Sequence, residues 1–159
     1  MAAPAAPASS TTTSATSGSA NPNVRFKSRV LDTACAEPAL ARAHFESKLA
    51  FETDPSDVKF DMDNAPGSFV VVDCRSPESY AKGHVPGALN IPYRTMNNES
   101  TSRIPKGTPV ITYCSSISCN ASTKGAARMS SLGFKVKEML GGMASWQGEG
   151  YSIATGPNP

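Results

Sequence analysis

Cys114 is the residue of this 159-residue chain whose type and position best suit covalent chemistry. It directly follows the apolar segment 109–113, which predicts a buried strand, and it precedes a helical pattern of apolar residues. A cysteine between a strand and a helix N-terminus faces unpaired backbone N–H groups and the positive end of the helix dipole. These features favour a nucleophilic thiolate. A buried, inert cysteine at a strand end is the alternative that position alone leaves open.

The residues after Cys114 must supply most of the stabilisation of such a thiolate. Lowering a thiol pKa from about 8.5 to about 6.5 needs ~2.7 kcal/mol, whereas a helix end usually supplies only about 0.3 to 1 kcal/mol. We therefore expect loop amides and hydroxyls to close around the sulfur, with Lys124 as a source of positive charge. The predicted substrate-binding loop consists of Ser115, Ser116, Ile117, Ser118, Cys119 and Asn120.

Cys119 lies five residues after Cys114 in this loop. It can act as a resolving thiol that condenses with an oxidised or persulfidated Cys114. A cysteine that only packs the loop is the other interpretation, because the sequence does not establish how closely the two Cα atoms approach.

Alternating strand and helix patterns position this loop. Strands are predicted at 69–73, 88–91, 109–113 and 135–140, and helices at 38–50, at 76–80 and around Ala126–Leu132. The acidic segment between the first helix and the first strand is predicted to be irregular and to separate the two elements. Such alternation predicts an α/β fold with a central parallel sheet of about five strands and helices on both faces. Ligands of such folds bind beyond the carboxyl ends of the strands, where Cys114 lies.

Composition limits the classes of partner and the domain count. Residues 1–23 contain no charged side chain and are rich in Ala, Pro, Ser and Thr, which indicates a disordered leader before one domain at 24–159. The 15 basic and 13 acidic residues form no basic stripe, so we expect no nucleic-acid partner. The longest apolar runs are too short to span a membrane. Four cysteines without a secretory signal favour the cytoplasm.

Three segments in order resemble the signature segments of rhodanese-like domains: VVVDCRSPESYAKGHVPGALNIP, VITYC and EMLGGMASW. The resemblance covers roughly residues 38–150. It implies a sulfurtransferase in which Cys114 attacks the sulfane sulfur of a donor such as thiosulfate and passes it, as a persulfide, to a thiol or cyanide acceptor. The resemblance implies no metal and no organic cofactor.

The same resemblance indicates roles for the other motif residues. Asp73 and Arg75 match an Asp-x-Arg pattern that is expected to brace the loop as an ion pair, with the alternative of a supporting role at the site. His84 is expected to brace the turn into the next strand. Gly141 and Gly142 are expected to supply backbone freedom, and Trp146 to pack against the domain.

The loop after Cys114 departs from the common family pattern. It contains no arginine, which makes a dianion such as thiosulfate a poor donor, and the 19 positions from Cys114 to Gly133 are about two more than in the common form. The loop resembles a subgroup with a Cys-x4-Cys-Asn pattern. Asn120 stands where a related phosphatase would need arginine, which argues against phosphatase activity.

Two hypotheses of different classes follow from the sequence. The first is a cytoplasmic sulfurtransferase that uses a Cys114 persulfide, a small sulfur-containing anion as donor, and a thiol, cyanide or protein thiol as acceptor. The second is a non-catalytic rhodanese-like binding or redox-sensing module, in which Cys114 and Cys119 form a reversible disulfide.

Overall fold

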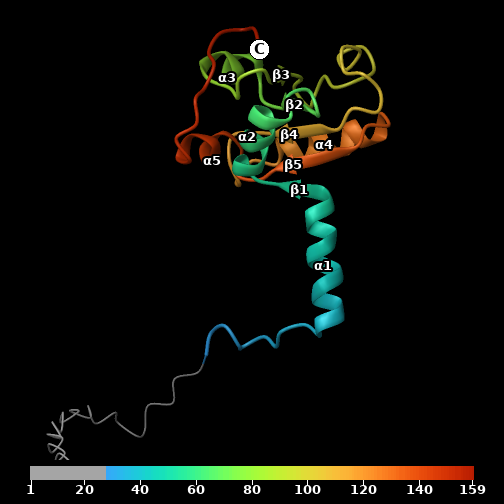
Figure 1. Ribbon diagram of the computed structural model, residues 1–159, viewed down its shortest axis with the longest axis vertical. Coiled ribbons are helices and arrows are strands. Elements are labelled where there is room, and N and C mark those ends of the chain that lie inside the picture. The colour runs from blue at the N-terminus through green and yellow to red at the C-terminus, as the bar shows by residue number, and fades with distance from the viewer. Residues whose placement is uncertain (1–27) are drawn as a thin grey trace, which may run out of the picture. The chain divides into compact units, whose positions relative to one another are not determined.

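A five-stranded parallel sheet forms the centre of the computed structural model, which describes residues 28–159 (Figure 1). The strand order is β1-β5-β4-β2-β3, and every neighbouring pair is parallel. This arrangement confirms the predicted α/β fold. The strands are β1 (Glu52–Thr53), β2 (Val70–Asp73), β3 (Leu89–Asn90), β4 (Val110–Tyr113) and β5 (Val136–Met139). The helices are α1 (Pro38–Phe51), α2 (Pro55–Asn64), α3 (Pro77–Lys82), α4 (Ala121–Ser131) and α5 (Gly142–Gly148).

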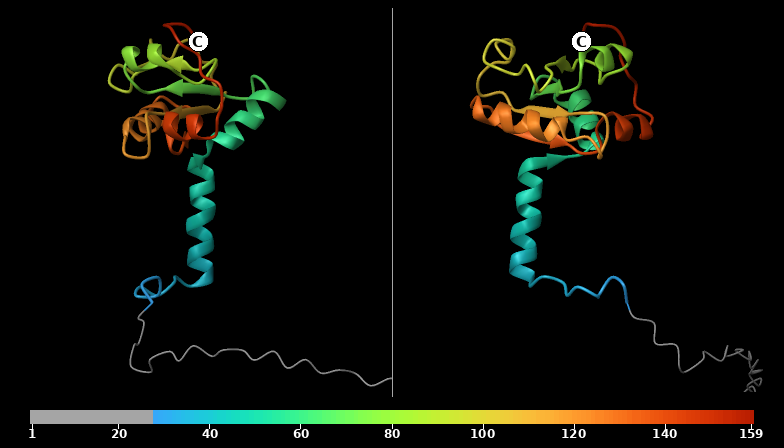
Figure 2. Two further views of the ribbon diagram at one scale, coloured as in Figure 1. Left: turned by 90° about the vertical axis from the view of Figure 1, so that its left-hand side faces the viewer. Right: turned by 180° about the vertical axis from the view of Figure 1, so that it is seen from behind.

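Two hydrophobic clusters cover the two faces of the sheet. Figures 1 and 2 show α2, α4 and α5 beside the sheet. Val72 and Val110 point to the face that α4 covers through Met129. Val71 and Ile111 point to the other face, where α2 and α5 pack. Successive strand residues alternate between the faces, and both faces are apolar, which explains the continuous β-branched runs of the sequence.

Three elements were missing from the sequence-based prediction. The acidic segment after α1 is not irregular. It forms β1, which pairs with β5, and then α2, whose first turn is capped because the Asp54 carboxylate accepts a hydrogen bond from Asp57 N–H at 2.9 Å. The segment after Gly141 forms α5. Two-residue strands and short helices carry too few residues to show a period.

Helix α1 confirms the predicted helix but buries none of its residues. Its large apolar side chains are exposed, at Leu40, Phe45, Leu49 and Phe51. Pro38 starts the helix, as expected for a first-turn proline. Residues Glu37–Pro159 form one compact unit. The predicted leader at 1–23 and the predicted domain start at residue 24 lie outside the described residues.

The carboxyl ends of the three central strands meet at one edge of the sheet. Asp73 ends β2, Tyr113 ends β4, and Met139 ends β5 two residues before Gly141. Because β2 and β5 both pair with β4, the three sequence motifs come together around Cys114. Among residues 28–159, no helix is long and apolar enough to cross a membrane.

Candidate active site

The loop from Cys114 to Asn120 connects β4 to α4, and the N-terminus of α5 holds its first residues. Met143 N–H donates to the Cys114 carbonyl at 2.9 Å, and Ala144 N–H donates to the Ser115 carbonyl at 2.9 Å. Gly142 makes this approach possible, since it has a φ of 54° and a Cβ there would collide with the Cys114 carbonyl. The Gly-Gly motif therefore positions the loop.

The Cys114 thiol is buried, with only 2% of the residue exposed. Its sulfur lies 2.9 Å from the carbonyl oxygen of Cys119 and 3.6 Å from that of Ser116. These carbonyls are hydrogen-bond acceptors, so they suit a protonated sulfur. The predicted cradle of amides is therefore not what the Cys114 sulfur contacts. The loop folds back, and it turns carbonyl groups rather than N–H groups toward that sulfur.

The Ser122 hydroxyl lies between the Cys114 sulfur and the Glu138 carboxylate. Ser122 Oγ lies 3.2 Å from Cys114 Sγ and donates to Glu138 Oε1 at 2.6 Å. The Thr123 hydroxyl donates to the same carboxylate oxygen at 3.0 Å. The single proton of the Ser122 hydroxyl goes to the charged and closer acceptor, Glu138, so the Ser122 oxygen presents its lone pairs to the Cys114 sulfur, whose own proton is directed to the Cys119 carbonyl.

Cys119 has the more favourable surroundings for a thiolate. Partial burial raises the pKa of its thiol, but hydrogen bonds from the Ala121 backbone, the Cys114 thiol and the Ser115 backbone, together with the charge of Arg75, lower the pKa below its ordinary value. Cys119 is half-buried, whereas Cys114 is enclosed. The loop's amide donors thus serve its second cysteine.

A pocket of about 310 Å³ opens in front of Cys119. Its lining is rich in hydroxyl and basic side chains; it comprises Cys74, Arg75, Ser76, Ser79, Pro92, Tyr93, Arg94, Ser115, Cys119 and Ala121. Of the predicted loop residues, Ser115 and Cys119 line this pocket. Ile117 is exposed by 88%, and Ser118 and Asn120 are also exposed.

Basic side chains surround Tyr93 at this pocket. The Arg94 guanidinium carbon lies 5.3 Å from the centroid of the Tyr93 ring, Lys124 Nζ lies 5.5 Å from it, and the Arg128 guanidinium carbon 5.6 Å. Arg128 also donates to the Tyr93 carbonyl. None of these three cations belongs to an ion pair among residues 28–159. Of the three, Arg94 lines the pocket, and it comes from the segment after β3 rather than from the loop.

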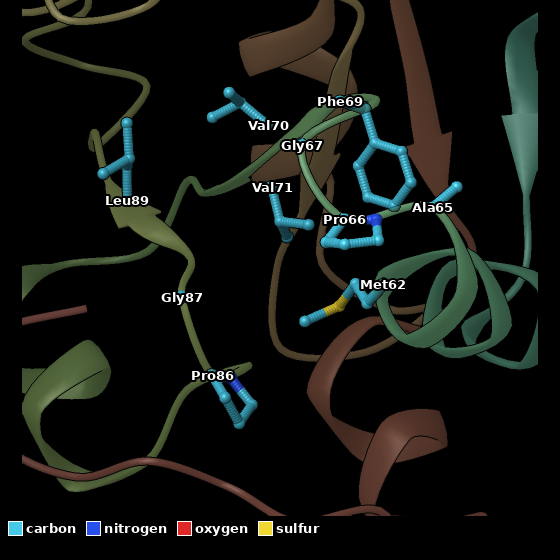
Figure 3. Close-up of a pocket in the computed structure, with 10 residues that line it drawn as sticks. All are labelled: Met62, Ala65, Pro66, Gly67, Phe69, Val70, Val71, Pro86, Gly87 and Leu89. Atoms are coloured by element: carbon cyan, nitrogen blue, oxygen red, sulfur yellow. The ribbon is translucent and has the colours of Figure 1, made fainter.

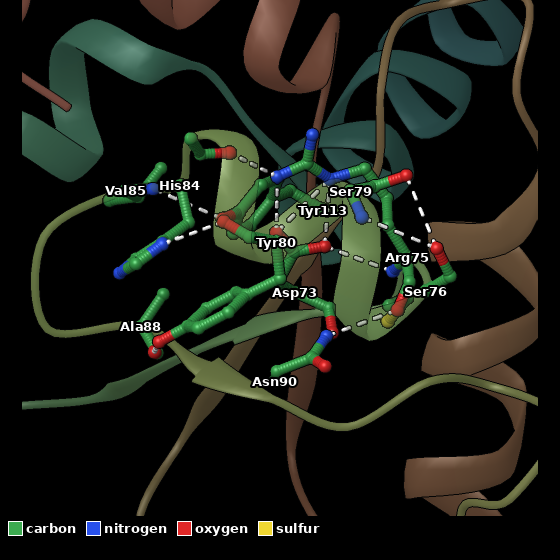
Figure 4. Close-up of polar contacts among 12 residues, drawn as sticks. Asp73, Arg75, Ser76, Ser79, Tyr80, His84, Val85, Ala88, Asn90 and Tyr113 are labelled. Carbon is green, nitrogen blue, oxygen red and sulfur yellow. Dashed lines mark hydrogen bonds and ion pairs between the residues drawn. The ribbon is translucent and has the colours of Figure 1, made fainter. Parts of the chain in front are cut away.

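Arg75 is tied to a buried carboxylate (Figure 4). Its Nη2 lies 2.5 Å from Asp73 Oδ2, its Nε donates to Asp73 Oδ1 at 2.9 Å, and Nη2 also donates to the Gly83 carbonyl at 2.7 Å. Asp73 is fully buried. This geometry matches the bracing role expected for the pair.

His84 stacks on Tyr80, and its Nδ1 lies 2.9 Å from the Tyr80 carbonyl, which places it in the turn and away from the loop.

The remaining cysteine near the loop is protected. Cys74 is buried, and desolvation, reinforced by the negative charge of Asp73, raises the pKa of its thiol strongly.

A second pocket of about 310 Å³ lies away from the loop, beside Met62, Phe69 and Pro86 (Figure 3). Its lining is apolar and contains no nucleophile. Among residues 28–159, no group of three His, Cys, Asp or Glu side chains is placed to hold a metal ion.

Sequence reasoning missed Tyr93, Arg94, Ser122 and Glu138. Tyr93 and Arg94 follow β3 and lie about 20 positions before the loop, so no local spacing connects them with it. Glu138 is the one acidic residue of β5, and a charge in a strand that pairs on both sides is the signal that could have found it.

Comparison with known proteins assigns the family. A tRNA sulfurtransferase of Desulfurococcus amylolyticus is 30% identical over 87 residues, covering 55% of this chain and 17% of that protein. The HTH-type transcriptional regulator Rv0324 of Mycobacterium tuberculosis is 28% identical over 90 residues, covering 57% of this chain and 39% of that protein. The chain therefore spans less than half of either relative.

A solved structure shares the fold, and a family model identifies the family. The crystal structure of the BH2092 protein from Bacillus halodurans matches with a TM-score of 0.73 and 37% identity, and it covers 76% of this chain and 88% of that chain. The family model of the rhodanese-like domain matches residues 54–149, the segment that contains all three motifs and the loop. The chain belongs to the rhodanese-like domain family.

Proposed function

We propose that this protein is a sulfurtransferase that carries sulfane sulfur as a persulfide on Cys114, within a loop of the Cys-x4-Cys-Asn form. The observation that carries the proposal is the loop itself. It places two thiols at the carboxyl edge of the sheet, beside a pocket with basic and hydroxyl side chains. Sulfur transfer is also the activity in the name of the Desulfurococcus relative.

The chemistry of the pocket supports an anionic donor and a thiol acceptor. A thiolate attacks the sulfane sulfur of the donor, and the electron pair of the broken bond leaves on the donor's remaining sulfur. Arg94 and the serine hydroxyls can stabilise the negative charge of that leaving group. We propose thiosulfate and small organic persulfides as the donor class, cyanide and thiols as acceptors, and the cytoplasm as the compartment, because free thiols persist there.

Mass spectrometry after incubation with sulfane donors tests the proposal. The wild-type protein should gain one sulfur atom and lose it again to a thiol acceptor. The double variant Cys114→Ser/Cys119→Ser should gain none, whereas Cys35→Ser, which removes an exposed thiol outside the loop, should behave like the wild type. Absence of added sulfur with every donor, or its persistence in the double variant, would contradict the proposal.

A redox-sensing role for the same loop is the second candidate function. The closeness of the two residues favours it, since Cys114 Sγ lies 2.9 Å from the backbone carbonyl oxygen of Cys119. Peroxide titration with peptide mapping should then yield a Cys114–Cys119 disulfide and leave Cys74 reduced. A protein that takes up no sulfur but forms this bond would be a sensor rather than an enzyme.

A further inference from the structure

The two cysteines of the loop face different surroundings, and only one of them lines the pocket. Cys119 is half-exposed and forms part of the pocket wall, together with Ser115 and Arg94. Cys114 is 98% buried and absent from that wall, and its sulfur contacts two carbonyl oxygens and the Ser122 hydroxyl. A molecule in the pocket therefore meets Cys119 first.

The pocket also restricts the chemistry of its occupant. Arg75 is neutralised by Asp73, but Arg94, Lys124 and Arg128 have no carboxylate partner among residues 28–159. The three surround Tyr93, which lines the pocket. No acidic side chain is among the described residues that line the pocket. Its volume of about 310 Å³ fits a small molecule rather than a protein segment. The complementary ligand is a small anion, such as the persulfide of a thiol that carries a carboxylate.

We propose that Cys119 is a second sulfur carrier, which takes sulfane sulfur from a small, carboxylate-bearing persulfide in this pocket and exchanges it with Cys114 behind it. This inference rests on the proposed sulfurtransferase function and adds the route by which sulfur reaches Cys114. Cys119 exchanges sulfur with the ligand in the pocket, and the buried Cys114 holds the sulfur as a persulfide.

Each of the two steps is a displacement at sulfur. In the first, the Cys119 thiolate attacks the outer sulfur of R–S–SH, a new S–S bond forms, and the old S–S bond breaks to release R–S⁻. In the second, the Cys114 thiolate attacks the outer sulfur of the Cys119 persulfide and releases the Cys119 thiolate. Neither step needs an oxidant or a reductant.

The second step requires Cys114 to lose its proton, and the structure provides an acceptor. The Ser122 oxygen lies 3.2 Å from Cys114 Sγ, and its hydroxyl donates to Glu138 at 2.6 Å. When the Cys114 S–H turns from the Cys119 carbonyl to the Ser122 oxygen, its proton can move to that oxygen as the Ser122 proton moves to Glu138. Glu138 touches neither sulfur, so it acts through Ser122.

Single variants, mapped after rapid quenching and alkylation, test the relay. With cysteine persulfide as donor, Cys114→Ser should still gain one sulfur, located on Cys119. Cys119→Ser should load Cys114 at least about tenfold more slowly than the wild type, since the donor must reach an enclosed thiol. In the wild type, sulfur should appear on Cys119 before it appears on Cys114.

These results separate the relay from the proposed function. Loading of Cys114 at the wild-type rate in Cys119→Ser, absence of sulfur on Cys119 in Cys114→Ser, or appearance of sulfur on Cys114 first would overturn the relay and leave the sulfurtransferase intact. A wild-type protein that gains no sulfur would overturn both. The appearance order in the wild type needs no variant, so the relay stays falsifiable if a variant misfolds.

A pair of donors tests the charge of the ligand. Arg94→Gln should lower kcat/KM for the persulfide of 3-mercaptopropionate about tenfold more than for the persulfide of 2-mercaptoethanol, which has the same reacting group but no carboxylate. Arg103→Gln removes an exposed arginine that does not line the pocket and should change neither value. An equal response of both donors to Arg94→Gln would overturn the choice of an anionic ligand.

Discussion

On the pocket side of the loop, Cys119 is surrounded by amide donors, hydroxyl groups and the basic side chains of Arg75 and Arg94. On the sheet side, only a few residues away, Cys114 faces carbonyl oxygens, the Ser122 hydroxyl and, through that hydroxyl, the Glu138 carboxylate. The first environment stabilises negative charge on sulfur, and the second accepts a proton from sulfur. One loop therefore holds a reactive thiol and a protected thiol.

This difference shows that the position of a cysteine at a strand end does not decide its chemical environment. The backbone groups of Ala121 and Ser115 lower the thiol pKa of its neighbour Cys119. The loop doubles back there, so that Cys119 N–H donates to the Ser116 carbonyl at 3.0 Å. The charged side chains are separated in the same way: Arg94 lies beside the pocket, and the Glu138 carboxylate lies on the sheet side.

Gly142→Ala should have the largest effect, because it disturbs both sides of the loop at once. A Cβ at this φ of 54° would run into the Cys114 carbonyl and displace the two hydrogen bonds that α5 donates to the loop. We expect a loss of ~2–3 kcal/mol in the free energy of unfolding. Urea denaturation measures this value, and sulfur uptake should fall with it.

Gly148→Ala in the same helix is the matched control. Gly148 has open space at its Cβ position and no positive φ, so alanine should leave stability unchanged or raise it by less than about 1 kcal/mol. Equal stability of both alanine variants would show that α5 does not position the loop.

Glu138→Gln tests the sheet side alone. Glutamine still accepts the Ser122 hydrogen bond but is a far weaker proton acceptor, so the exchange of sulfur from Cys119 to Cys114 should slow about tenfold. Loading of Cys119 should not change. Quenched time courses with peptide mapping separate the two steps. Glu149→Gln, which changes an exposed acid at the end of α5, should have no effect.

Slower loading of Cys119 in Glu138→Gln would mean that the carboxylate acts on the whole loop. Ser122→Ala provides the second comparison, because it removes the hydroxyl between sulfur and carboxylate. It should slow the same step, and an unchanged exchange rate in both variants would remove the proton path.

Much of this molecule was predictable from its sequence. The β-branched segment before Asp73 and the segment before Cys114 form central strands, Ser76 caps α3, and the parallel sheet brings the motifs together. Apolar runs and capping residues, which are local in sequence, predict the strands and helices. In a parallel sheet the carboxyl ends of the strands then lie at one edge. Asp73 and Arg75 were also expected to pair, and their spacing of two residues around a strand end allows it.

The division between the two thiols was not predictable. It depends on which way the carbonyl groups of Ser116 and Cys119 point, and a stretch of serines adopts many loop conformations. Arg94 reaches the pocket from a separate segment after β3, so counting cations inside the loop underestimated the positive charge. Such contacts come from tertiary packing rather than from local sequence.

Cys114→Ser should shorten the lifetime of bound sulfur. With only Cys119 available, the persulfide stays at the pocket, where solvent thiols reach it. We expect its half-life at a fixed, low concentration of an added thiol to fall about fivefold relative to the wild type, as enclosure of a disulfide-type bond slows thiol attack. Mass spectrometry over time measures the decay. Equal half-lives would show that Cys114 does not protect the sulfur.

Alkylation of Cys119 across pH should show the smallest effect and the most direct one. The pKa of its thiol is lowered, and the thiolate is the reacting form, so labelling in the folded protein should reach half its plateau at a lower pH than labelling of the same cysteine in the urea-unfolded chain. Cys74, whose thiol pKa is raised by burial, should resist labelling until the chain unfolds. If Cys119 labels with the same pH midpoint in both states, then the amides and Arg75 do not favour its thiolate, and the two sides of the loop differ only in accessibility.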